Sequence, residues 1–302
     1  MKANENNRLV LSTPTAFNFD ECLRFLDRSS LECLHRIEGR YVYRLLEIKD
    51  DLILVSMGCD QPNQMQIAIL NKTVDAGAQK SIHKFVEDWF DLDRDLTPFY
   101  RLSDRDPLLK KLAERHYGLR IIGIPDFWEA LCWSIIGQQI NLQFAYTLKK
   151  RMVEAFGEKI VYEGNVYWAF PKTERIAALD PDDLKLLQFS RQKAQYAIEI
   201  AQQICAGNIS KEKLQSIENI EDKRNALIKL RGVGAWTADY VLMKCLRESS
   251  AFPIADVGLH NAIKLQLNLP QKPSLNEIQI MAQRWKGWEA YATFYLWRSL
   301  YE

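Results

Sequence analysis

Apolar residues recur every three or four positions, in one segment after another, from about Asp106 to the C-terminus. This spacing predicts amphipathic helices, and glycine, proline and asparagine stand between the segments where short connections are needed. Helices are expected over residues 127–136, 143–156, 181–187, 193–205, 220–230, 235–245, 258–267 and 275–284. A chain with this pattern has to build its core by packing helices against helices.

The N-terminal part has a mixed pattern of helix and strand. Short strand-like runs are joined by a hairpin turn, and two segments show helical spacing, the first with Asp20 placed to cap it. Strands are expected over residues 40–48, 52–57 and 64–70, the hairpin turn over residues 49–51, and helices over residues 19–28 and 79–90. The sequence therefore predicts an α+β fold. We expect a mixed α/β domain with a small antiparallel sheet at residues 1–105, and a mostly helical domain of two helical subdomains at residues 106–302.

The composition is ordinary for a soluble globular protein, with 47% hydrophobic and 26% charged residues. The N-terminal segment is polar and lacks the apolar core of a secretory signal. The most apolar long stretch, residues 119–140, is interrupted by Pro125, Asp126 and Glu129, which favours a loop and a buried helix over a membrane span. We therefore expect a cytoplasmic protein that does not bind membranes.

Six cysteines are spread along the chain without any C-x-x-C pair. This spacing matches neither a zinc site nor an iron–sulfur site. Scattered cysteines with mostly apolar neighbours are typical of proteins in a reducing cytoplasm, where they act as small core residues.

The net charge of +1 does not by itself indicate a protein that binds nucleic acid. Phosphates can still be held by backbone amides and by local clusters of basic residues. Arg191 and Lys193, together with the basic run Lys149, Lys150 and Arg151, are candidates for such contacts. A charge run, however, more often forms a solvated surface.

The most informative stretch is IKLRGVGAWTADYVLMKC at residues 228–245, in which Gly232 and Gly234 flank Val233. A glycine–apolar–glycine turn between two helices lets the chain reverse tightly and brings bare backbone close to a ligand. The N–H groups that open the second helix at Ala235 form a natural seat for a phosphate. A simple pair of helices with a glycine C-cap is the alternative interpretation.

Two aromatic residues and one carboxylate follow this turn. Trp236 and Tyr240 are four residues apart, so both rings project from one face of the second helix, as a core pair also would. Asp256 comes 22 residues after Gly234, follows Pro253, and stands immediately before a new helical pattern. An aspartate there is most often an N-cap, and a capping carboxylate is held as rigidly as a catalytic one must be.

The segments LRGVGAWTADYV (residues 230–241) and FPIADVGL (residues 252–259) resemble the helix-hairpin-helix (HhH-GPD) superfamily of DNA glycosylases, most closely its AlkA-like DNA-3-methyladenine glycosylase II branch. Residues 127–145 look like the family's G-Q-Q helix and loop, and residues 99–120 resemble the family's segment that leads into the helical domain. Residues 284–298 resemble the C-terminal helix of the AlkA-like branch. The resemblance covers residues 99–302 with several motifs in the right order. The N-terminal part matches only loosely, as the kind of α/β domain that such glycosylases often carry.

The resemblance implies a role for each of these residues in excising a base. It makes Asp256 the catalytic carboxylate. It assigns the base pocket to Trp236, Tyr240 and Trp297, although Trp297 could equally be a core aromatic residue. It assigns DNA contacts to Gly232, Val233, Gly234, Ala235, Gln138 and Gln139. The last two lie where related enzymes place the residue that fills the gap left by a flipped base; the branch can use an apolar wedge there, and this chain departs from it with glutamine.

The resemblance also bears on cofactors. No cofactor is required, and the family can bind a monovalent cation on hairpin carbonyls, which by position would be those of Ile228, Leu230 and Val233. Members with lyase activity carry a lysine two residues after the hairpin, where this chain has Trp236, so no Schiff-base intermediate is expected. The four-cysteine iron–sulfur loop of other branches is absent from the sequence.

The function predicted from these observations is base excision repair of double-stranded DNA. We expect a monomeric, monofunctional glycosylase that flips a damaged base, an N-alkylated purine such as 3-methyladenine, and hydrolyses its glycosidic bond to leave an abasic site. One alternative is a glycosylase for oxidised or deaminated bases: 8-oxoguanine, uracil or hypoxanthine. Another is a non-catalytic protein that keeps the hairpin only to bind DNA. An enzyme with a helical cleft for a small molecule has no supporting motif.

Overall fold

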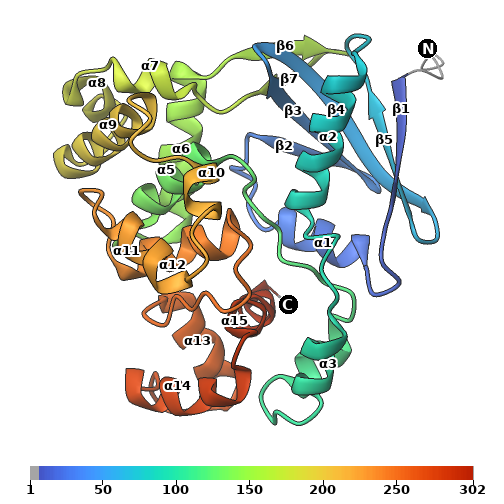
Figure 1. Cartoon of the computed structure of the whole chain (residues 1–302), viewed down its shortest axis with the longest axis vertical. Coiled ribbons are helices and arrows are strands. Elements are labelled where there is room, and N and C mark those ends of the chain that lie inside the picture. Colours follow the sequence, from blue (N-terminus) through green and yellow to red (C-terminus); the bar gives the residue numbers. More distant parts are fainter. Residues whose placement is uncertain (1–6, 302) are drawn as a thin grey trace. The chain divides into compact units, whose positions relative to one another are not determined.

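The computed structural model describes residues 7–301 (Figure 1). The chain forms two compact units, each built from separate stretches of sequence. The first unit comprises Met1–Thr13, Leu26–Glu87 and Trp128–Ser210, and the second comprises Pro14–Phe25, Asp88–Phe127 and Lys211–Glu302. The domain boundary expected near residue 105 stays a prediction. The α+β fold class is confirmed by the five-stranded sheet and the helices that follow it.

An antiparallel sheet in the order β1-β5-β4-β3-β2 dominates the first unit. Its side chains alternate as a half-buried sheet requires: in β5, Met65, Ile67 and Ile69 are buried and their neighbours are more exposed. The three strands expected from the sequence are confirmed, and the two edge strands were not predicted because they are short, five residues in β1 and four in β2. The strands are β1 (Arg8–Ser12), β2 (His35–Glu38), β3 (Tyr41–Ile48), β4 (Asp51–Gln61) and β5 (Gln64–Ile69).

Arg44 of β3 joins the sheet to two helices, α2 (Ala76–Trp89) and α5 (Phe127–Gly137). Its guanidinium lies 5.2 Å from the ring centroid of Phe85 in α2 and forms a buried ion pair at 2.6 Å with Glu129 in α5. Because both charges are buried, removing either one would leave the other uncompensated. The pair therefore links the first turn of α5 to the sheet, and α5 leads directly to the G-Q-Q loop.

A small hairpin interrupts the region that was expected to be nearly all helical. Strand β6 (Lys159–Tyr162) pairs with β7 (Asn165–Trp168). Both turn residues have positive φ, +47° at Glu163 and +78° at Gly164, as the favoured two-residue hairpin turn requires. Tyr167 packs into one core cluster with Leu45 and Leu54 of the large sheet. Only this packing partner, distant in sequence, makes such a short hairpin stable.

Most of the remaining helices of the first unit begin at side-chain caps that the sequence displays. Asn141 caps α6 and Ser190 caps α9, each accepting a hydrogen bond from the backbone N–H three residues later. Asp180 and Asp183 form a capping box on α8. These helices are α6 (Leu142–Phe156), α7 (Thr173–Ala177), α8 (Pro181–Lys185) and α9 (Arg191–Cys205).

The second unit is almost entirely helical around an aromatic core. The ring of Phe99 lies 5.3 Å from that of Tyr291 and 5.0 Å from that of Tyr295, and all three are fully buried. Its helices are α1 (Phe19–Leu26), α3 (Thr97–Ser103), α4 (Lys110–Arg115), α10 (Lys211–Gln215), α11 (Ile220–Ile228), α12 (Ala235–Lys244), α13 (Val257–Gln266), α14 (Leu275–Ala282) and α15 (Glu289–Arg298). All eight helices expected in residues 106–302 are confirmed, with ends that differ by at most two residues.

Two smaller expectations need correction. Asp20 does not cap α1, because the helix begins one residue earlier and the side chain of Asn18 accepts the hydrogen bond from the N–H of Glu21. The cysteines are not uniformly core residues, since Cys205 is exposed while Cys22, Cys132 and Cys245 are buried. Within residues 7–301, no helix is long and apolar enough to cross a membrane.

Candidate active site

The hairpin lies between α11 and α12, and its two glycines differ. Gly232 has φ +89°, a conformation that side chains with a Cβ rarely adopt. Gly234 is the N-cap of α12 in extended backbone, with φ −94° and ψ 179°, and a Cβ there would meet no atom within 4 Å. The turn therefore requires glycine at position 232 only. At position 234 any need for glycine must come from something that approaches the chain from outside.

The start of α12 is exposed at Gly234 and Ala235. No side chain caps the helix at Gly234, and Ala235 is exposed. Beneath this end the turn is fixed by a 3.0 Å hydrogen bond from the N–H of Val233 to the carbonyl of Leu230, and both side chains are buried. An uncapped helix N-terminus on a rigid turn is well suited to bind an anion.

An ion pair between a half-buried arginine and a buried aspartate links the two hairpin helices. The guanidinium of Arg224 in α11 lies 2.6 Å from the carboxylate of Asp239 in α12. Burial raises the pKa of Asp239 to about 6, although the guanidinium opposes this shift. A perturbed carboxylate can mark a catalytic acid, but this one is buried against its partner, so its geometry is that of a brace between helices.

Asp256 is the N-cap of α13 and is held by its own loop. Its side-chain Oδ1 accepts a 2.8 Å hydrogen bond from the N–H of Leu259, and its backbone N–H donates to the carbonyl of Pro253 at 2.8 Å. The ring of His260 contacts the carbonyl of Ile254 at 2.7 Å. The carboxylate is half-buried, so it is both fixed in position and accessible.

The three pocket aromatics predicted from the sequence lie together around this carboxylate. The ring of Tyr240 lies 5.6 Å from that of Trp236 and 6.1 Å from that of Trp297, with interplanar angles of 36° in both pairs. The indole Nε1 of Trp236 donates to Asp256 Oδ2 at 2.9 Å, and that of Trp297 donates to Oδ1 at 2.8 Å. The second unit thus brings α12, α13 and α15 together at one acidic, aromatic site.

A further residue at this site, Gly258, could not be identified from the sequence pattern. A Cβ at this position would lie 2.9 Å from Asp256 Oδ1 and 3.3 Å from ring atoms of Trp297. Its φ is ordinary for a helix, so the backbone does not demand glycine. The narrow space between the Asp256 carboxylate and the Trp297 indole is what requires glycine at this position.

The G-Q-Q loop belongs to the first unit. Gln139 is exposed and has φ +55°, an uncommon conformation for a residue with a side chain. Just before it, the ammonium of Lys193 donates to the carbonyl of Ile136 at 2.6 Å, at the C-terminal end of α5. Burial lowers the pKa of Lys193. The helix end before the loop is therefore anchored by Lys193, while Gln139 is exposed.

The basic residues suggested as phosphate contacts have different environments. Lys149 is buried in a 2.6 Å ion pair with Glu32 and is not available to DNA, because helix α6 packs this face inward. The guanidinium of Arg151 donates a hydrogen bond to the carbonyl of Leu187. Lys150 and Arg191 are more exposed and remain candidates.

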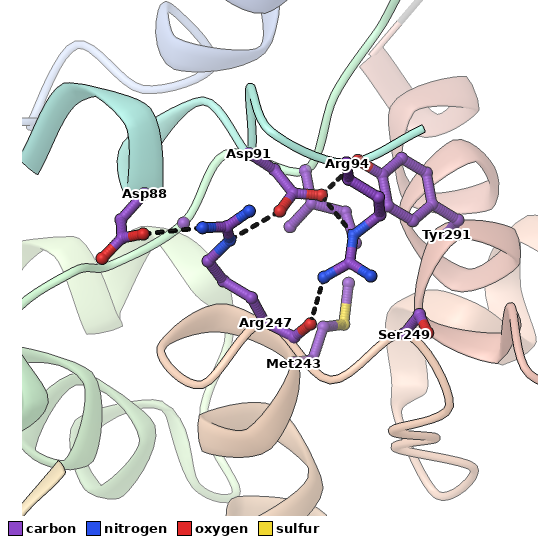
Figure 2. Close-up of a pocket in the computed structure, with 9 residues that line it drawn as sticks. Asp88, Asp91, Arg94, Met243, Arg247, Ser249 and Tyr291 are labelled. Carbon is purple, nitrogen blue, oxygen red and sulfur yellow. Dashed lines mark hydrogen bonds and ion pairs between the residues drawn. The ribbon is translucent and has the colours of Figure 1, made fainter. Parts of the chain in front are cut away.

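One small pocket in the second unit is filled by a charged network rather than shaped for a ligand (Figure 2). Asp91 lies at its centre. Its carboxylate accepts from Arg247 Nε at 2.6 Å, from Arg94 Nε at 2.8 Å and from the hydroxyl of Tyr291 at 2.6 Å. Asp91 and Arg247 have φ of +47° and +61°, so strained backbone is held in place by these contacts.

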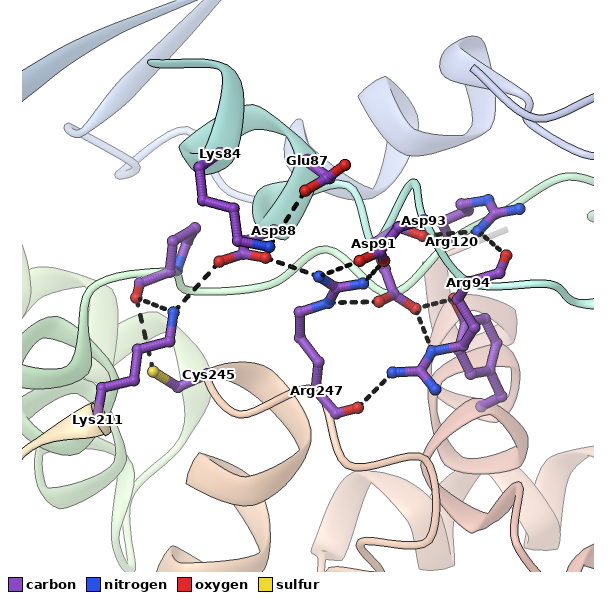
Figure 3. A network of polar contacts seen from close by, with 12 residues as sticks. Lys84, Glu87, Asp88, Asp91, Asp93, Arg94, Arg120, Lys211, Cys245 and Arg247 are labelled. Carbon is purple, nitrogen blue, oxygen red and sulfur yellow. Dashed lines mark hydrogen bonds and ion pairs between the residues drawn. The ribbon is translucent and has the colours of Figure 1, made fainter. Parts of the chain in front are cut away.

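The network extends along the segment that precedes α3 (Figure 3). Arg247 also pairs with Asp88 at 2.7 Å and with the exposed Asp93, and Lys211 donates to the carbonyl of Pro125 at 2.9 Å. Burial alone would raise the pKa of Asp91, but the guanidinium groups of Arg247 and Arg94 hold that pKa below its ordinary value. The carboxylate oxygens of Asp88, Asp91 and Asp93 all contact basic side chains, so we interpret this cluster as structural.

The family models identify both halves of the chain. The model described as HhH-GPD superfamily base excision DNA repair protein matches residues 132–290, and the model described as 8-oxoguanine DNA glycosylase, N-terminal domain, matches residues 10–131.

Individual proteins agree with these models. The chain is 47% identical to a DNA-3-methyladenine glycosylase of Bacillus subtilis (strain 168), over 98% of each sequence. Among solved structures, it is similar to a 3-methyladenine DNA-glycosylase from Archaeoglobus fulgidus, with TM-score 0.83, 22% identity, and 96% and 97% of the two chains covered. It is also similar to the Clostridium acetobutylicum 8-oxoguanine glycosylase/lyase in complex with double-stranded DNA, with TM-score 0.75, 21% identity, and 97% and 94% covered. At these identities the structural matches show the fold alone.

Proposed function

The chain belongs to the HhH-GPD superfamily of base excision DNA repair proteins, and we propose that it hydrolyses the glycosidic bond of N-alkylated purines in double-stranded DNA with Asp256 as its catalytic carboxylate. It is a DNA glycosylase, and therefore a hydrolase. The relative with 47% identity over nearly the whole chain is named for 3-methyladenine, which supports that base as a substrate. We propose further that the chain acts as a monomer on cytoplasmic DNA.

The observation that carries the proposal is the fixed, accessible carboxylate of Asp256 among three aromatic rings. Departure of the base builds positive charge on the deoxyribose. A carboxylate about 4 Å away, at an effective dielectric constant near 20, stabilises such a charge by roughly 4 kcal/mol. That energy corresponds to about a thousandfold in rate. Asp256 would act by stabilising this charge, by orienting the attacking water, or by both.

The aromatic rings account for the choice of base. An N-alkylated purine carries a positive charge, and electron-rich rings attract it by stacking and by cation–π interaction, at about 0.5–2 kcal/mol for each contact. Trp236, Tyr240 and Trp297 offer three such rings next to Asp256. A cationic base is also a good leaving group, which fits a site in which we identify no general acid.

DNA contacts are assigned by the same proposal. The uncapped start of α12 at Gly234 and Ala235 would bind a backbone phosphate, and Gln139 would fill the gap left by the flipped base. A monovalent cation at the hairpin would be held by the carbonyls of Ile228, at the end of α11, and of Leu230 and Val233 in the turn that follows, because hard cations prefer oxygen ligands. Such an ion would stiffen the turn.

A panel of lesion duplexes tests the substrate class. Under single-turnover conditions, duplexes with 3-methyladenine should lose the base and retain an intact strand with an abasic site. Duplexes with 8-oxoguanine should not react, and borohydride should trap no covalent complex, because Trp236 stands where a Schiff-base lysine would be needed. Efficient release of 8-oxoguanine with a trapped adduct would instead favour the activity named in the N-terminal family model.

The two hairpin glycines provide a separate test of DNA binding. Gly234→Ala should leave stability within about 0.5 kcal/mol, because its backbone is extended and its Cβ has open space. It should nevertheless weaken binding to damaged and undamaged duplexes alike by about tenfold, the loss of one charge-assisted hydrogen bond. Gly232→Ala is the contrasting variant and should cost about 1–2 kcal/mol of stability, because its φ is positive. Unchanged DNA affinity in a folded Gly234→Ala protein would exclude the hairpin as the anchor.

A further inference from the structure

We propose that Trp236 and Trp297 are positioning residues for Asp256, and that their indole N–H groups determine which lone pair of the carboxylate can act on the substrate. The proposal rests on Asp256 as the catalytic carboxylate. It gives the two tryptophans a role beyond stacking on the base, and it explains why glycine occupies position 258, beside Asp256 and Trp297.

The hydrogen bonds of Asp256 leave one acceptor position open. An ionised carboxylate has about four lone-pair sites, two on each oxygen. Oδ1 accepts from the N–H of Leu259 and from Trp297 Nε1, both at 2.8 Å, so its two sites are filled. Oδ2 accepts only from Trp236 Nε1 at 2.9 Å among the described residues. One lone pair of Oδ2 therefore faces the developing positive charge or the attacking water.

The three donors come from three different helices, which makes the orientation rigid. Leu259 belongs to α13, Trp236 to the first turn of α12, and Trp297 to the end of α15. Rotation of the carboxylate about its terminal bond would break all three hydrogen bonds at once. Trp236 also lies two residues after Gly234, so the carboxylate is tied to the helix end that is proposed to hold the DNA backbone.

This role is compatible with stacking, because the two use different parts of the indole. The N–H lies in the ring plane and points from its edge, whereas a cationic base contacts the ring face. Gly258 keeps the edge contact open, since a Cβ there would approach both Asp256 Oδ1 and the Trp297 ring too closely. The position at which lyases of this superfamily carry lysine thus holds a hydrogen-bond donor to the carboxylate.

Phenylalanine substitutions isolate the N–H groups. Trp236→Phe and Trp297→Phe keep an aromatic face and remove one donor each. Each should lower the single-turnover rate of 3-methyladenine release by about ten- to a hundredfold, the usual effect of a hydrogen bond to a charged group. The Kd for lesion duplex should change by less than about threefold, because the phosphate contacts are untouched. Trp288→Phe is the matched control: its ring packs on Phe99 and Tyr291, and no hydrogen bond among the described residues uses its indole N–H.

A double-mutant cycle separates positioning from stacking. In a chain that also carries Asp256→Asn, the same two phenylalanine substitutions should cost less than about threefold in the residual rate, since no charge is left to position. Equal fold-losses in both backgrounds would mean that the rings act on the base alone, and would overturn this inference while leaving Asp256 as the catalytic residue. An Asp256→Asn chain that releases base at the wild-type rate would overturn the catalytic assignment as well.

An NMR experiment on the indole N–H signals checks the geometry without relying on activity. In the free protein, Asp256→Asn should shift the signals of Trp236 and Trp297 and leave that of Trp288 in place. Gly258→Ala should shift the Trp297 signal more than the Trp236 signal, because the added Cβ meets the Trp297 ring. Unmoved signals for both tryptophans in the Asp256→Asn protein would show that the hydrogen bonds do not exist in solution.

Discussion

Asp256→Asn should lower the single-turnover rate of base release by about two to four orders of magnitude, the effect expected when a nearby carboxylate no longer stabilises the developing positive charge. The amide keeps the size of the side chain and an oxygen that can accept from the N–H of Leu259 and the indole of Trp297. Its NH₂ group would face the Trp236 donor, so one hydrogen bond is lost, at about 1–3 kcal/mol of stability. Folding should therefore survive while catalysis fails.

Binding distinguishes a catalytic loss from a damaged site. Affinity for a lesion duplex should hold steady or tighten slightly, because the phosphates no longer face that negative charge. A fluorescence anisotropy titration beside the rate measurement provides the comparison. If the variant cleaves at nearly the wild-type rate, Asp256 is only the cap of α13, and another group must carry the chemistry.

Asp91→Asn should destabilise the chain by about 3 kcal/mol, the lower end of the cost of breaking a buried ion pair. Asparagine tolerates the positive φ of this position, so the substitution mainly removes the charge that Arg247 and Arg94 surround. For a protein of this size, the expected fall in Tm is roughly 6–12 °C. Thermal unfolding followed by circular dichroism measures it.

A matched control and a pH series test the electrostatic origin. Asp93→Asn removes a carboxylate that pairs with the same Arg247 but is half exposed, so it should change stability by less than about 1 kcal/mol. The folded-state pKa of Asp91 lies below its ordinary value of 3.8, so its contribution is fully present above that value and is lost as pH falls through the folded pKa. The difference between wild type and Asp91→Asn should therefore be large at neutral pH and vanish in strong acid. A difference that is independent of pH would point to packing instead.

The local pattern of the sequence predicted most of the elements because their signals are themselves local. Helical spacing identified the segments that became α5, α6 and α11 to α14. The hairpin β6–β7 was missed because its stability comes from Tyr167 packing on Leu45 and Leu54, far away in the chain. The buried pair of Lys149 with Glu32 was likewise invisible, since a run of three basic residues looks like a surface.

At the candidate site, the sequence by itself determined the type of fold, the turn with Gly232, and a carboxylate at the start of a helix, because turns and caps depend on neighbours within a few residues. Only the tertiary structure decided that the indoles of Trp236 and Trp297 both donate to that carboxylate, and that Gly258 leaves room for the indole of Trp297. Those contacts join α12, α13 and α15, whose relative placement follows from packing across the whole unit. Spacing along the chain carries no information about a hydrogen bond between residues that meet only when these helices do.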